Sequence, residues 1–94
     1  MPVGVLELHL HIPGCASLKE KRRRLKPLLA RLRREFNVSA AEVDHLDVWQ
    51  DAAVLCAWVS NDHAHLQRSL QSIVGWVEKY WPDMNVVEVQ IEII

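Results

Sequence analysis

The sequence has few cysteines, no long apolar run and no leader-like start, and each absence narrows its class. Cys15 and Cys56 lie far apart and form no CxxC pair, so we expect two reduced structural thiols. No run of about 18 apolar residues occurs, which argues against a transmembrane helix. The first residues lack a basic stretch followed by an apolar one, so we expect no signal peptide and a cytoplasmic location.

Motifs for catalysis and metal binding are also missing. The sequence contains no nucleophile elbow, P-loop or paired-carboxylate pattern, so we expect no enzymatic activity and no cofactor. His9 and His11 would point to one side of a strand, where Glu7 or Glu92 could complete a metal site. None of the histidines has the spacing of a specific zinc site, so we expect no metal.

Charge is abundant but unevenly placed. The 94-residue chain has a net charge of −1, yet residues 19–34 hold nine of its eleven basic residues and only one acid. That segment carries +8 and the rest of the chain −9. This separation predicts one face that attracts a polyanion and another that repels it.

One amphipathic helix is predicted over Ser17–Phe36. Ser17 stands three residues before Glu20, which is the spacing of a capping box. Pro27 should kink or break a helix, but the leucine period continues through it in phase, so one bent helix is favoured over two short ones. We place Asn37 as a left-handed C-terminal cap.

Two faces of this helix follow from about 100° of rotation per residue. The apolar stripe contains Leu18, Leu25, Leu29, Leu32 and Phe36, with Leu28 at its edge. The outward face carries Lys19, Arg23, Arg24, Lys26, Arg31, Arg33 and Arg34. Lys21 and Arg22 flank the stripe, and we expect their methylene stems to lie along it.

The remaining elements are expected to be four strands and a second helix. The strands are Met1–Ile12, Val38–Asp44, Ala52–Val59 and Val86–Ile94, and the helix begins after Ser60–Asp62 and ends near Tyr80. In the second strand Ala41 and Val43 are expected on one face, with Glu42 and Asp44 on the other. Ala52–Val59 is apolar on both faces, which indicates a central position or one face covered by a partner.

The order β-α-β-β-α-β predicts a single ferredoxin-like domain over residues 1–94, in the α+β class. Its antiparallel sheet should have the order 4-1-3-2, with both helices on one face. The free face is expected to show Val3, Val5, Glu7, His9 and His11, then Val54, Cys56 and Trp58, then Glu88, Gln90 and Glu92. Its apolar part predicts a homodimer through this face or through the edge strand Val86–Ile94.

Two functions compete on these observations. The leading hypothesis is a non-enzymatic RNA- or ribosome-associated protein that binds phosphates through the seven outward cations, because arginine forks suit phosphate geometry. The alternative is a protein-interaction module that uses the loop with Asp47, Trp49 and Gln50 together with the free sheet face. Trp49 is expected to plug one end of the core, and otherwise to anchor a partner.

Three segments resemble the YlxP-like family of small bacterial proteins. They are SLKEKR at 17–22, NVSAAEVDHLDVWQ at 37–50 and SND at 60–62. The resemblance implies a ferredoxin-like fold, a cytoplasmic location, no assigned activity and genes near those for translation initiation and ribosome maturation. This chain departs from the family at Asp51, where a basic residue is usual, and at Leu55, where glycine is usual. The first departure weakens phosphate binding by the loop, and the second indicates a repacked strand.

Overall fold

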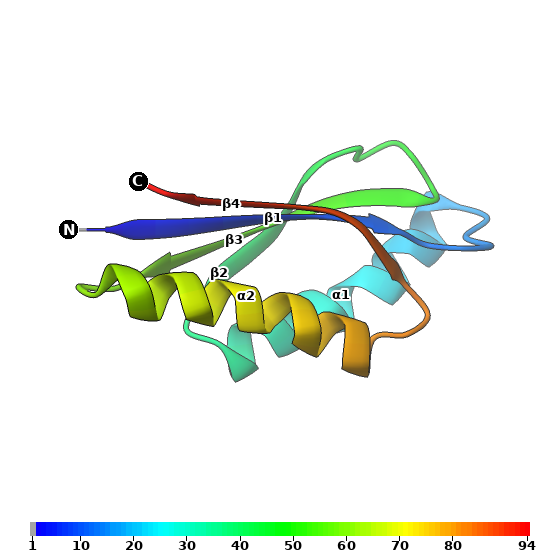
Figure 1. Ribbon diagram of the computed structural model, residues 1–94. Helices are drawn as coiled ribbons and strands as arrows, with labels where there is room; N and C mark the ends of the chain where they lie inside the picture. The colour runs from blue at the N-terminus through cyan, green and yellow to red at the C-terminus, as the bar shows by residue number, and fades with distance from the viewer. Residues whose placement is uncertain (1) are drawn as a thin grey trace.

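The computed structural model describes residues 2–94, so Met1 of the predicted first strand lies outside the described residues. Its elements, in chain order, are β1 (Val3–His11), α1 (Leu18–Glu35), β2 (Ser39–Asp44), β3 (Asp51–Val59), α2 (His63–Tyr80) and β4 (Asn85–Ile93). The four strands form one antiparallel sheet with the order β2-β3-β1-β4. Both helices cover the same face of the sheet (Figure 1). The predicted ferredoxin-like fold is therefore confirmed.

The face of β1 that meets the helices is the one that the sequence predicts. Leu6, Leu8 and Leu10 are buried there, and Gly4 continues the row. A Cβ atom on Gly4 would lie 2.7 Å from Cδ1 of Leu70 and 2.8 Å from Cγ of Leu66, both on α2. Glycine at this position thus lets α2 lie close against the sheet.

The faces of β2 and β3 differ from the prediction. Leu6 of β1 pairs with Cys56 and Leu8 with Val54, so these two β3 residues face the helices with Trp58. The free face of β3 instead carries Ala53, Leu55, Ala57 and Val59, because successive residues of a strand alternate between faces. Both faces of β3 are apolar, so only its pairing with β1 decides which face is buried.

In β2, Ala40 and Glu42 face the helices, because they pair with Cys56 and Val54. Ala41 lies opposite Leu55 on the free face, and the register shifts between Glu42 and Asp44. Ala41 and Glu42 lie on opposite faces as expected, but Asp44 pairs with Ala53 of the free face, so the prediction that it shares a face with Glu42 is wrong. The Glu42 carboxylate is directed toward Lys21 of α1.

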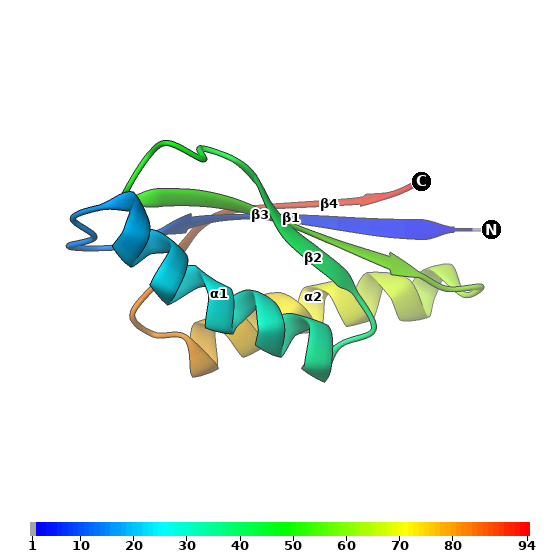
Figure 2. The same cartoon turned by 180° about the vertical axis from the view of Figure 1, so that it is seen from behind.

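Helix α1 is continuous through Pro27, so the prediction of one helix is correct and that of two short helices is wrong. Seen from behind in Figure 2, it crosses the sheet beside β2, while α2 lies beneath the other strands. Its buried stripe is Lys21, Leu25, Leu28 and Leu32. Leu28 therefore lies within the stripe rather than at its edge, and Leu18, Leu29 and Phe36 are only partly buried.

The helix ends are capped by short polar side chains. Ser17 Oγ accepts a hydrogen bond from Glu20 N at 3.0 Å, while Glu20 Oε2 accepts one from Ala16 N at 2.7 Å. Asp62 caps α2 by accepting from His65 N. α1 ends at Glu35, the following residue Phe36 is extended, and Asn37 has no positive φ, so the left-handed cap predicted there is wrong.

Candidate functional site

Lys21 is the most unusual side chain in the structure, because it is a lysine that is only 1% exposed. Its Nζ donates hydrogen bonds to the carbonyl oxygens of His45 and Val48, both at 2.7 Å. The same atom lies 2.6 Å from Oε2 of Glu42. The ammonium group therefore donates two hydrogen bonds to backbone carbonyls and forms an ion pair with the Glu42 carboxylate, and a buried charge is tolerated when it is paired in this way. The expectation that Lys21 only flanks the stripe is wrong.

The three acceptors lie on the β2–β3 loop (residues 45–50) and on the strand before it. The loop rises on the side of the sheet opposite the helices (Figure 1). Gln50 O accepts a hydrogen bond from Ile12 N at 2.8 Å, and His45 takes a positive φ of 58° at the start of the loop. Lys21 thus fixes the loop to the beginning of α1.

The loop exposes apolar side chains. Trp49 is 50% exposed, Leu46 55% and Val48 42%. The prediction that Trp49 closes the end of the core is therefore wrong, because its indole is exposed to solvent. Trp49 also lines an open depression of about 310 Å³ together with Asp47, Val48, Gln50 and Asp51.

Three of the seven predicted phosphate-binding cations donate hydrogen bonds to other residues of the protein. Arg24 donates to Pro13 O and to Asp83 O at 3.0 and 3.1 Å. Arg31 pairs with Glu35 at 3.1 Å, and its guanidinium lies over the Trp76 ring. Arg33 is held by the β2 backbone, donating to Ala40 O at 2.7 Å. These three side chains are therefore engaged in contacts within the fold and are less available to phosphate than predicted.

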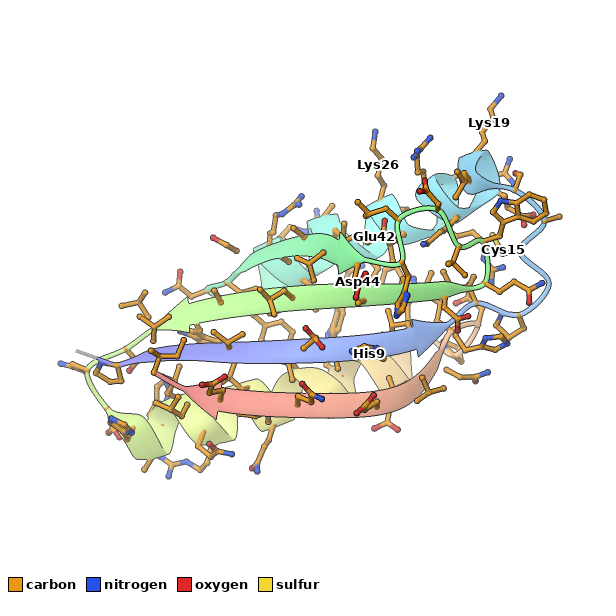
Figure 3. The ribbon with its side chains drawn as sticks, turned by 90° about the horizontal axis from the view of Figure 1, so that it is seen from above. His9, Cys15, Lys19, Lys26, Glu42 and Asp44 are labelled. Carbon is orange, nitrogen blue, oxygen red and sulfur yellow. The ribbon has the colours of Figure 1, made fainter. Side chains whose placement is uncertain are left out.

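The other cations of α1 form what we call the α1 basic surface: Lys19, Arg22, Arg23, Lys26 and Arg34, all exposed. Within residues 2–94, only Arg23 of this set has a carboxylate within 4.0 Å, namely Glu20 at 3.9 Å. Figure 3 shows Lys19 and Lys26 pointing outward beyond the β2 edge of the sheet. Arg22, which we expected to lie along the apolar stripe, belongs to this exposed group.

The β2–β3 loop and the α1 basic surface are neighbours. The Val48 carbonyl binds Lys21, which lies between Lys19 and Arg22 in the helix. Gln50 Nε2 donates to Cys15 O at 3.5 Å, just before the helix begins. The exposed indole and the first cations of the α1 basic surface, Lys19 and Arg22, therefore share one end of the molecule, while Arg34 lies in the last turn of the helix.

The free sheet face is acidic along β4 and apolar along β3. Glu88, Gln90 and Glu92 lie on this face as predicted, opposite His9, Glu7 and Val5. Trp58, which we expected on this face, instead lies on the helix side, where its ring centroid is 6.3 Å from that of Phe36. The free face therefore lacks the tryptophan that the sequence pattern placed there.

The histidines and cysteines take structural positions. His9 Nε2 lies 2.6 Å from Glu7 Oε2, and the His9 ring contacts that of His45. Among residues 2–94, no three His, Cys, Asp or Glu side chains gather closely enough to hold a metal ion. Both cysteines are buried and free, and burial raises the pKa of the Cys56 thiol to about 11, which keeps it protonated at neutral pH.

No helix within residues 2–94 is long and apolar enough to cross a membrane. Comparison with known proteins gives two matches. A family model described as "Protein of unknown function (DUF503)" matches residues 3–91. The "Uncharacterized protein YlxP" of Bacillus subtilis (strain 168) is 33% identical over 78 residues, which cover 83% of this chain and 85% of that protein. These matches confirm the resemblance found in the three sequence segments.

Proposed function

Because the chain belongs to the DUF503 family, whose function is unknown, we propose a role from its surface: a non-enzymatic, cytoplasmic protein that binds RNA or the ribosome. The binding surface is the α1 basic surface. The observation that carries this proposal is the set of five exposed cations, four of which have no carboxylate within 4.0 Å among residues 2–94.

Cations that are not neutralised internally are the ones available to a polyanion. Three of the five are arginines, whose planar forks match phosphate oxygens, and each neutralised phosphate adds affinity that decreases with salt. The acids Glu88 and Glu92 lie on β4, which is the far edge of the sheet from β2. At that distance these two acids weakly repel a phosphate that is bound on α1. Arg24, Arg31 and Arg33 mainly make contacts within the fold, and they add to the positive electrostatic potential around α1 without forming the binding surface.

A salt series with a fluorescently labelled structured RNA tests this proposal. We expect Arg23→Ser/Arg34→Ser to bind more weakly at low salt and to reduce the slope of log K against log salt by roughly 0.7 to 0.9 per lost phosphate contact. The matched control is Arg68→Ser/Lys79→Ser, which removes the same charge from exposed positions on α2. Equal losses in the two variants would show that only net charge matters and would refute a site on α1.

The exposed β2–β3 loop supports a second candidate, a protein-interaction module. An exposed tryptophan flanked by Leu46 and Val48 is the type of residue that dominates protein interfaces. On this alternative, Trp49→Ala folds normally and loses a protein that the wild type retains in a crosslinking pull-down from the host. A partner retained equally by both forms would exclude the loop as its contact.

We also propose that the protein is a homodimer through the free sheet face or the β4 edge. The apolar part of that face includes Val3 and Val5 of β1, and on β3 it consists of Ala53, Leu55, Ala57 and Val59 rather than the β3 residues predicted from the sequence. A shallow apolar depression lies beside it, lined by Ser39, Ala40, Ala41, Val43, Leu55 and Ala57. On β4, Val87 and Val89 are 62% and 39% exposed, which leaves the edge open to a second strand.

A further inference from the structure

The depression beside Trp49 has a lining of mixed chemistry. Trp49 and Val48 supply apolar surface, while Asp47, Gln50 and Asp51 supply carboxylate and amide groups. Its volume of about 310 Å³ lies at the small end of the range of ligand sites. A small planar group with an apolar face and a polar edge matches this lining, and a nucleobase is such a group.

The charges around the depression distinguish the two parts of a nucleotide. Asp47 and Asp51 line the depression itself and would repel a phosphate placed there. The cations lie outside it, on α1, where Lys19 precedes Lys21 by two residues and Arg22 follows it directly. A nucleotide therefore fits with its base toward the loop and its phosphate toward the helix.

Lys21 gives this arrangement its rigidity. Its bonds to His45 O and Val48 O hold the backbone just before Trp49 in one position. Little loop entropy then has to be lost on binding, which favours affinity at a small site. The loop of an unattached hairpin would not have this advantage.

We propose that this depression binds an unpaired RNA base stacked on Trp49, while the α1 basic surface holds the adjoining phosphates. This inference rests on the proposed function and specifies its ligand as single-stranded RNA. Bases within a duplex are stacked and paired, so their faces cannot reach an indole. Carboxylates accept hydrogen bonds from exocyclic amino groups, so Asp47 favours cytosine over uracil.

The test measures fluorescence anisotropy of labelled oligocytidine, oligouridine and an RNA duplex with the wild type and loop variants. We expect Trp49→Ala to weaken oligocytidine binding by about five- to a hundredfold and to leave duplex binding unchanged. Trp49→Phe should restore most of the loss, because it keeps an aromatic face. Asp47→Asn, whose amide also donates, should narrow the preference for oligocytidine over oligouridine.

Leu46→Ala is the matched control, because Leu46 is exposed on the same loop but does not line the depression. It should bind all three RNAs as the wild type does, and urea unfolding should show that every variant is folded. Oligocytidine binding that Trp49→Ala leaves unchanged overturns the base site, while the proposed function stands. Failure of the wild type to bind any RNA at low salt removes both.

Discussion

Lys21 joins three pieces of the chain through one ammonium group. Replacing it with methionine leaves the Glu42 carboxylate, whose side chain is only 16% exposed, without its cation, and leaves two carbonyls without a donor. We expect Lys21→Met to lower the free energy of unfolding by about 3 kcal/mol, as when one partner of a buried pair is removed. The adjacent exposed Arg22→Met should change it by less than about 0.5 kcal/mol. Urea unfolding measures both, and similar values for the two would contradict a structural role for the Lys21 contacts.

Single residues were the hardest feature to predict from the sequence. Lys21 stands four residues before Leu25, in the buried stripe, but a lysine there indicates burial only once its partner is known. Glu42 is that partner, and its inward direction depends on the register of β2 with β3. The prediction that Trp49 is buried at the end of the core is wrong for a related reason. Its exposure depends on the path of the β2–β3 loop, which the Lys21 contacts determine.

At the scale of the element, we expect the stability of the first turn of α2 to depend on pH. The backbone hydrogen bond from His65 holds the pKa of the Asp62 carboxyl below its usual 3.8, with smaller help from Ala64 N and Arg68, against partial desolvation. A lowered folded-state pKa means that the cap stabilises fully above the unfolded-state pKa and loses its effect as pH falls through the folded value.

The difference in urea midpoint between the wild type and Asp62→Ala should therefore be constant from neutral pH down to about 5, then shrink below about pH 4. Ser17→Ala is the control, because the Ser17 hydroxyl that caps α1 does not ionise. If the difference in urea midpoint between the wild type and Asp62→Ala stays unchanged at low pH, the Asp62 carboxylate does not cap the helix.

Elements were predictable where polarity alternates. In β1 and β4 the leucines, valines and isoleucines alternate with polar residues, so the correct faces followed from the sequence. In β3 both faces are apolar, so pattern alone cannot choose between Leu55 and Val54. The cation pattern of α1 predicted a basic side but not which cations bond to neighbouring elements. Asp83 is distant in sequence from Arg24, and the Ala40 carbonyl that binds Arg33 belongs to β2, whose place beside α1 the pattern does not give.

At the scale of the whole molecule, the free sheet face and the β4 edge offer two routes to a dimer. Leu55 lies at the centre of the free face, opposite Glu7 of β1. We expect Leu55→Glu to convert a face-to-face dimer into a monomer, because the new charge would be buried opposite its own copy. Sedimentation equilibrium measures the mass and circular dichroism the fold. A Leu55→Glu protein that remains dimeric would leave the β4 edge as the interface, and a monomeric wild type would refute both routes.

The chain ends meet at one end of the sheet, where Val3 and Ile94 exchange backbone hydrogen bonds. Figure 1 places both ends away from the β2–β3 loop and the beginning of α1. An affinity tag, a surface-immobilisation handle or a fluorescent reporter attached at either end would thus extend away from Trp49 and Lys19. Labelled or tethered protein should report the same affinities as the free form.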